Sequence, residues 1–287
     1  MTPRPPCTIE PSIRLRRAIH VGDALLVKRI LKSHPNLVHN PDASPAGLSN
    51  SNLHLAASLG RTDVCRVLLA AGHERPCPAL NENHQTALML AAREGHTDVV
   101  HLLCEADSKA VYEDDDENYH DDGGGGGGGA RVLLRRDIRG RDAIMEASAG
   151  GHDTVLQLLL TYFPGGPYEA VRRADAEGNT ALHFASGNGN LLVLRTLLAA
   201  GADVERRNAW NWTPAAYSAT VQAEVYLKGL VSEVGRMQQQ QQQQHKQQPV
   251  RREAAANGAA ALGTANVDPG KMVGGVRVVA DHSDEDE

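Results

Sequence analysis

The stretch "GNTALHFASGNGN", Gly178 to Asn190, decides how the whole chain is interpreted. It combines three glycines, one histidine and four asparagine or serine side chains. That composition suits a phosphate-binding loop, a catalytic centre or plain scaffolding. A loop built for one site should occur once, but related stretches begin at Ser51 ("SNLHLAASLGR"), Gln85 ("QTALMLAAREGH"), Arg141 ("RDAIMEASAGGH") and Trp212 ("WTPAAYSA"). The repetition therefore favours scaffolding.

The spacing of these copies indicates the architecture. Their leucine-like positions are 35, 56, 38 and 33 residues apart, at Leu53, Leu88, Ile144, Leu182 and Ala215. In the first four copies a glycine follows seven residues later, at Gly60, Gly95, Gly151 and Gly189. A period near 33 residues with a T-P-L-H-x-A-like core resembles the ankyrin repeat. The resemblance implies an all-α solenoid of stacked helix pairs joined by β-turns or hairpins.

Each copy carries the local signals of two antiparallel helices. A hydroxyl residue stands where a helix N-cap is wanted, at Ser51, Thr86, Thr180 and Thr213. The following glycine predicts the end of the first helix, because positive φ costs glycine little. The second segment, for example "DVCRVLLAAG", repeats its apolar residues at three- and four-residue steps, as a one-sided helix requires. Such a pair buries its apolar face only against its neighbours.

The histidines of the repeated core are expected to be structural. His54 and His183 occupy equivalent positions, and methionine replaces them at Met89 and Met145. A catalytic role would not tolerate that replacement. We expect each imidazole to hydrogen-bond backbone within its own repeat turn.

The pattern divides the chain into three regions. A disordered lead-in is expected at 1–11, an ankyrin-repeat domain of about six repeats at 12–231, and a disordered Gln-rich and acidic tail at 232–287. The first repeat, from Ser12 to Val38, is degenerate, as terminal repeats often are. An acidic and Gly-rich loop at about 107–133 accounts for the 56-residue spacing. Its seven glycines lack the flanking pattern of a phosphate loop.

Composition argues against several function classes. Aromatic residues make up 3% of the chain, and the repeats leave no room for a catalytic domain, so we expect no enzyme and no cofactor. Neither a bilayer-spanning run nor a signal peptide is recognisable, which predicts an intracellular protein. Cys65 and Cys104 fall on the expected buried faces, and the cysteine spacing indicates no metal site. Nucleic-acid binding would need a basic stripe with interleaved aromatics, which the sequence lacks.

Candidate partner-binding residues lie in two places. The predicted turn tips carry Arg139, Arg141, Glu177 and Trp210, and the first repeat carries Arg14, Arg16 and Arg17. Trp210 is either an interface residue or folds back on the previous repeat, whereas Trp212 is expected to pack between turns. The arginines either meet a partner or form the polar outer face of a capping repeat. Ser283, within "DHSDEDE", is a candidate phosphorylation site in the acidic tail.

The N-terminal repeats also resemble a narrower family. The stretch "PSIRLRRAIHVGDALLVKRILKSHPNLVHNPD", followed by "SNLHLAASLGRTDVCRVLLAAGHE", is similar to the fungal ankyrin-repeat accessory subunit of target of rapamycin complex 2. The resemblance is densest over 11–106. It implies a non-catalytic scaffold whose partners are the target of rapamycin kinase and its companion subunits. It also implies a cytoplasmic protein with a pool at the plasma membrane, held there through the complex. The alternative is a generic ankyrin adaptor, such as a protein that recruits substrates to a ubiquitin ligase.

Overall fold

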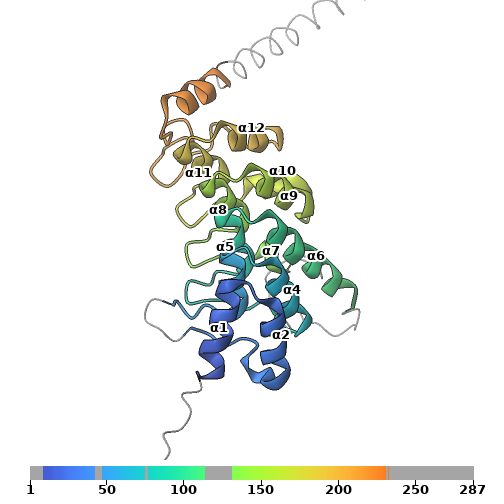
Figure 1. Cartoon of the computed structure of the whole chain (residues 1–287). Helices are drawn as coiled ribbons and strands as arrows, with labels where there is room; N and C mark the ends of the chain where they lie inside the picture. The colour runs from blue at the N-terminus through green and yellow to red at the C-terminus, as the bar shows by residue number, and fades with distance from the viewer. Residues whose placement is uncertain (1–8, 43–46, 75–76, 114–130, 231, 233–287) are drawn as a thin grey trace, which may run out of the picture. The chain divides into compact units, whose positions relative to one another are not determined.

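The described part of the chain is a stack of helix pairs (Figure 1). The computed structural model describes residues 9–42, 47–74, 77–113, 131–230 and 232, so Ser283, most of the acidic loop and the tail lie outside it. The first helices of the pairs are α1 (Pro11–Val21), α3 (Asn52–Ser58), α5 (Ala87–Glu94), α8 (Ala143–Gly150) and α11 (Ala181–Asn188). The second helices are α2 (Ala24–Ser33), α4 (Thr62–Ala70), α6 (Thr97–Glu113), α9 (Asp153–Tyr162) and α12 (Leu191–Ala199).

The helices form two columns. The first helices contact one another in the order α1, α3, α5, α8 and α11, and the second helices in the order α2, α4, α6, α9 and α12. Within the described residues the β-structure is a single isolated bridge between Ala174 and Thr180. The predicted all-α solenoid of stacked helix pairs is therefore confirmed.

Small side chains let the first helices approach closely. Ala56, Ala91, Ala147 and Ala185 occupy equivalent positions, and all four are fully buried. The leucine-like residues of the repeat core are buried beside them. Cys65 and Cys104 are buried among the second helices, as expected, and burial raises the pKa of each thiol to about 12. Both cysteines therefore act as small apolar residues and not as reactive thiols.

The predicted helix ends are confirmed in the central repeats. Ser51 and Thr86 accept the backbone N–H groups of His54 and Met89, which caps α3 and α5. The repeat glycines end the first helices in the left-handed conformation, with φ of 81° at Gly95 and 73° at Gly189. That conformation costs a residue with a Cβ atom about 1–2 kcal/mol. Sequence position and backbone geometry therefore agree at both ends of the first helices.

The last repeat is less regular than the sequence predicts. Residues 214–217 form only a turn, and the chain becomes helical again at 221–230. Thr220 explains the break, because its Oγ1 accepts the backbone N–H of Ala223 and starts the second helix. Too few residues are left between Thr213 and Thr220 for a full first helix.

Two short helices were not expected. α7 (Arg131–Leu134) begins inside the predicted loop at about 107–133, and its Val132 and Leu133 are buried. α6 also continues into this loop, as far as Glu113. α10 (Gly166–Arg172) adds a turn of helix after α9, which accounts for the 38-residue spacing between the copies at Ile144 and Leu182. A proline in its first turn provides a signal for that helix start.

The glycine geometry gives a stability test. A Cβ atom on Gly95 would lie 2.5 Å from the His152 ring and would adopt φ +81°. Gly95→Ala should lower the free energy of unfolding by about 2 kcal/mol, measured by urea denaturation. Gly229→Ala is the matched control, because a Cβ atom there meets nothing within 4 Å. The control should match or exceed the wild-type stability, and equal stability of the two variants would contradict the assigned role of Gly95.

Candidate functional site

Four turns along one edge of the stack are built on the same side-chain contact. In each turn one Asn or Asp oxygen accepts two backbone N–H groups, from the residues two and four positions later. These residues are Asn81, Asp137, Asp175 and Asn208. Each stands seven residues before the leucine-like position of its repeat. Sequence reasoning missed this constant offset, although it is visible in the repeat alignment, and it sets the shape of these four tips.

Backbone hydrogen bonds join each turn to the next. The N–H of Ile138 donates to the Asn83 carbonyl at 3.0 Å, that of Ala176 to Arg139 at 2.9 Å, and that of Ala209 to Glu177 at 2.8 Å. The N–H of Glu82 reaches Leu48 in the same way. The turns are therefore held in register with one another, and their tips form a continuous row (Figure 1).

The histidines of the repeat core link neighbouring repeats. His54 Nε2 lies 2.8 Å from the Gln85 carbonyl, and His183 Nε2 lies 3.1 Å from that of Trp212. A carbonyl only accepts, so Nε2 carries the proton and Nδ1 accepts from Ser51 or Thr180. The structural role is as expected, but each contact reaches the following turn and not only the residue's own turn. Burial lowers the pKa of both histidines below the ordinary value.

A second set of contacts runs in the opposite direction. The residue after each repeat glycine donates to a carbonyl near the end of the previous first helix: Arg61 to His20, His96 to Ser58, His152 to Arg93, and Asn190 to Gly151. The four carbonyls at a helix C-terminus lack partners within the helix. These donors supply such partners, so each repeat completes the hydrogen bonding of the one before it.

The fourth repeat, which contains α8 and α9, has Met145 at the histidine position. An ion pair links this repeat to the next one instead. Asp142 caps α8 by accepting the Met145 N–H, and its other oxygen lies 3.2 Å from the Arg173 guanidinium. Burial raises the pKa of Asp142, and the charge of Arg173 opposes that shift. Arg173 also donates to the Leu134 carbonyl, so α10 is tied to the turn before repeat 4.

The turns and the first helices enclose a groove of about 360 Å³, which we call the central groove. It spans the second to fourth repeats. Its walls include Leu48, Asn83, Ile138, Arg139 and Arg141 of the turns and Leu90, Arg93 and Glu146 of the first helices. Ile138 is 58% exposed, so the groove offers an apolar contact beside several arginines. The predicted tip residues Arg139 and Arg141 thus come together here.

A charge pair between a buried carboxylate and a half-buried arginine lines the groove. Glu146 is 4% exposed, and its carboxylate lies 3.6 Å from Arg141 Nη1. The Arg141 guanidinium also lies 4.9 Å from the centre of the Phe184 ring. Burial raises the pKa of Glu146, while Arg141 and then Arg93 act to lower it. Arg141 is therefore bound within the protein, whereas the exposed Arg139 side chain is open to a partner.

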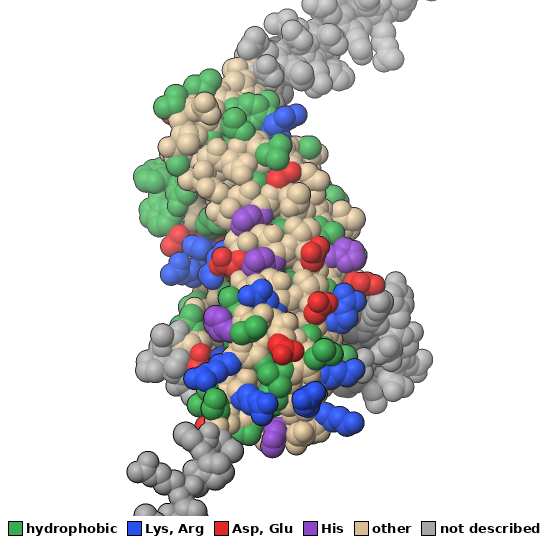
Figure 2. Space-filling model, in the orientation of Figure 1, with side chains coloured by type: hydrophobic (Ala, Val, Ile, Leu, Met, Phe, Trp, Pro, Cys, Tyr) green, Lys and Arg blue, Asp and Glu red, His purple; other side chains and the backbone are tan. Residues whose placement is uncertain are grey.

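The other candidate residues lie elsewhere. Glu177 and Trp210 occupy later turns, with Trp210 52% exposed. Arg14 and Arg17 are exposed on α1. Figure 2 shows Lys and Arg side chains gathered over the N-terminal repeats. Arg16 differs from them. Its guanidinium donates to the carbonyls of Asn40 and Asn50 and pairs with Asp42 at 3.3 Å, so it secures the loop after the first repeat.

The side chain of Trp212 is more exposed than the sequence predicts. It was expected to pack between turns, but it is 52% exposed, like Trp210. Its ring lies 6.1 Å from that of Tyr217, while its carbonyl accepts the His183 contact. Within the described chain no further repeat turn of the kind built on Asn208 follows to cover it, because the short turn at 214–217 leads directly towards the helix at 221–230. The backbone of Trp212 is structural and its side chain is a surface feature.

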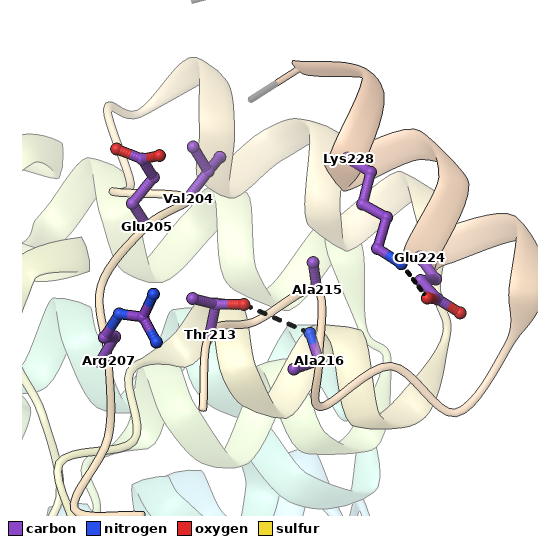
Figure 3. A pocket seen from close by; sticks show the side chains of 8 residues that line it. All are labelled: Val204, Glu205, Arg207, Thr213, Ala215, Ala216, Glu224 and Lys228. Atoms are coloured by element: carbon purple, nitrogen blue, oxygen red, sulfur yellow. Dashed lines mark hydrogen bonds and ion pairs between the residues drawn. The ribbon is translucent and has the colours of Figure 1, made fainter. Parts of the chain in front are cut away.

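A wider depression of about 670 Å³ lies near the last helix (Figure 3). Three of its four charged side chains are engaged within the protein: Lys228 pairs with Glu224, and Arg207 donates to the Asn211 carbonyl at 2.9 Å. The fourth is Glu205. Thr213 accepts the Ala216 N–H beside them. Neither Trp210 nor Trp212 lines this depression.

The central groove has the chemistry of a binding surface. The hydroxyl of Ser58, which lines the groove, donates to the Leu55 carbonyl. The buried carboxylate of Glu146 is paired with Arg141. Nothing in its lining couples a nucleophile to a base. Across the residues that the structure describes, no three His, Cys, Asp or Glu side chains are grouped to hold a metal ion. Likewise, none of the described helices is long and apolar enough to cross a bilayer.

Comparison with known proteins agrees with the stacked geometry. A family model described as ankyrin repeats (3 copies) matches residues 15–114 and 127–208. The chain belongs to the ankyrin-repeat family. Ankyrin-repeat proteins bind other proteins, which fits a rigid groove without catalytic chemistry.

Individual relatives carry several different functions. The target of rapamycin complex 2 subunit AVO2 of Saccharomyces cerevisiae is 28% identical over 225 residues, which is 77% of this chain and 46% of that protein. The mouse B-cell lymphoma 3 protein homolog is 29% identical over 70% of this chain and 46% of its own length. The Arabidopsis thaliana E3 ubiquitin-protein ligase XBAT33 is 31% identical over 67% of this chain and 36% of its own length. The chain thus spans less than half of each relative.

The inter-repeat histidine gives a pH prediction. The pKa of His183 is lowered in the folded state. As the pH falls below about 6.5, the unfolded chain therefore binds more protons at this residue than the folded chain does. The free energy of unfolding should fall as the pH drops through that range. His183→Met should lower the free energy of unfolding by about 1–2 kcal/mol at pH 7.5 and flatten its decline towards pH 5. Urea denaturation across this range measures both effects. Met89→Leu, at the equivalent position, should keep the wild-type pH profile, and an unflattened His183→Met profile would contradict the assignment.

Proposed function

We propose that the chain is a non-catalytic scaffold subunit of target of rapamycin complex 2 that regulates kinase signalling at the plasma membrane. The observation that carries the proposal is the similarity to the yeast subunit AVO2, which extends over 77% of this chain. The N-terminal sequence resemblance over 11–106 supports it. On this account the partners are the target of rapamycin kinase and its companion subunits, and the protein is cytoplasmic with a membrane-associated pool.

The central groove is our proposed docking surface within that complex. It combines exposed Ile138, solvated Arg139 and the fixed Arg141–Glu146 pair on a row of hydrogen-bonded turns. Preorganised turns favour binding because little conformational entropy is lost on association. Arg14 and Arg17 at the first repeat, and Glu177 and Trp210 at the later turns, are proposed as additional contacts. Arg16 contributes indirectly, since it secures the loop after the first repeat, which carries Leu48 of the groove wall.

The second candidate function is substrate recruitment for a ubiquitin ligase. Its support is the 31% identity to the plant ligase XBAT33. This reading needs ligase components as partners in place of the kinase. Affinity purification of the full chain from its native host, followed by mass spectrometry, separates the two. Recovery of the kinase and its companions supports the first function, and recovery of ligase components without them supports the second.

A charge reversal tests the docking surface. Arg139→Glu should reduce recovery of the kinase assembly about tenfold or more. The new carboxylate would face the partner group that pairs with the arginine, and like charges across an interface cost several kcal/mol. The exposed side chain makes no contact that the fold needs, so circular dichroism should remain unchanged. Quantitative mass spectrometry of the purified complex measures the loss.

Two further variants control this test. Arg14→Glu combined with Arg17→Glu probes the first repeat, and Trp210→Ala probes the last turns. If Arg139→Glu keeps full recovery while one of these loses it, the groove is the wrong surface. If the wild-type chain recovers neither the kinase nor its companions, the proposed complex is wrong and a general ankyrin adaptor remains.

A further inference from the structure

The first repeat exposes a mixed basic and apolar stripe on α2. Leu25, Lys28, Arg29 and Lys32 recur at three- and four-residue steps and therefore share one helix face. All four are exposed, and Leu25 is 80% exposed. The opposite face is buried against the array through Val27, Ile30 and Leu31. The stripe is thus the side of α2 that faces away from its own core.

α1 presents a similar row beside it. Ile13, Arg17 and Val21 follow one another at four-residue steps, opposite the buried Leu15, Ala18 and Ile19. Val21 is 78% exposed and Ile13 is 47% exposed. We call these outward side chains the basic end face: Arg17, Val21, Leu25, Lys28, Arg29 and Lys32. Figure 2 shows Lys and Arg side chains gathered at this end of the array with hydrophobic side chains between them.

The cations of the basic end face have no acidic partner among the described residues. The two helices themselves contain no acidic residue, and Glu10 and Asp23 stand just before them. Asp23 accepts the Leu26 N–H as the cap of α2. A capping repeat normally covers its core with a polar surface. Here it exposes large aliphatic side chains among cations instead.

We propose that the basic end face binds directly to the surface of a membrane rich in anionic lipids. Long cationic side chains reach the lipid headgroups, while Val21 and Leu25 enter the boundary of the acyl chains. A second copy of the chain is disfavoured, since two such faces would oppose like charges. An acidic protein surface is less well matched, because the described residues of α1 and α2 include no Phe, Tyr or Trp as an anchor and line neither the central groove nor the depression near the last helix. This contact is distinct from recruitment through the complex.

Flotation with vesicles tests the proposal on the purified full chain. It should bind phosphatidylcholine vesicles containing about one third phosphatidylserine and not vesicles of phosphatidylcholine alone. The net charge of the chain is −6, so binding to anionic vesicles needs a local basic surface. Binding should weaken between about 0.1 M and about 1 M salt, which shortens the Debye length from about 10 Å to about 3 Å.

Matched variants locate the contact. Lys28→Gln, Arg29→Gln and Lys32→Gln together should lower vesicle binding about a hundredfold, at roughly fivefold for each cation near the surface. A control variant removes the same charge from exposed positions elsewhere in the array, through Arg66→Gln, Arg135→Gln and Arg195→Gln. Its vesicle binding should be only slightly weaker than that of the wild type. Val21→Ser with Leu25→Ser should reduce the binding that persists at high salt. Unchanged melting temperatures verify that each variant is folded.

Three outcomes would overturn the proposal. The wild-type chain could fail to bind the anionic vesicles at low salt, or the control variant could lose as much binding as the end-face variant. The end-face variant could also keep vesicle binding but lose a protein partner in affinity purification, which would assign the surface to an acidic protein. The vesicle assay contains no complex, so its failure leaves the proposed scaffold function standing.

Discussion

Hydrogen bonds between successive turns are the constraint on which the binding surface depends. Each turn is shaped by its Asn or Asp side chain, and one backbone N–H then joins it to the turn before. His54 and His183 add a bond from a first helix to the following turn, and His96 and His152 add bonds to the previous first helix. Tips and helices therefore keep a fixed spacing, and the central groove exists because of it.

The repeated architecture could be predicted because it repeats. The spacing of Leu53, Leu88, Ile144 and Leu182 predicted the stack, and the glycines predicted the helix ends. α10 and the shortened last repeat were missed, since each is a local departure set by one helix start, near Pro167 or Thr220. A repeated sequence pattern predicts the structure that all repeats share, but it does not predict where a single repeat departs from that structure.

The surface was harder to predict than the fold. Position in a turn predicted that Arg139 and Arg141 lie at the tips, but not that Arg141 is tied to Glu146 and Phe184. The same limit applied to Arg16, whose three contacts come from residues that are distant in sequence. Basic residues that look alike in the sequence thus divide into structural ones, such as Arg16, and solvated ones, such as Lys28 and Arg139. Only the solvated group is free to meet a partner or a membrane.

The central claim is that turns and helices form one cooperative platform, and native-state hydrogen exchange tests it most directly. The amides of Ile138, Ala176 and Ala209 donate across repeats. They should open only together with the first-helix amides, with protection factors that agree within about tenfold. Near-unprotected exchange of these turn amides beside well-protected helices would contradict the claim, because it would show that the tips move independently of the stack.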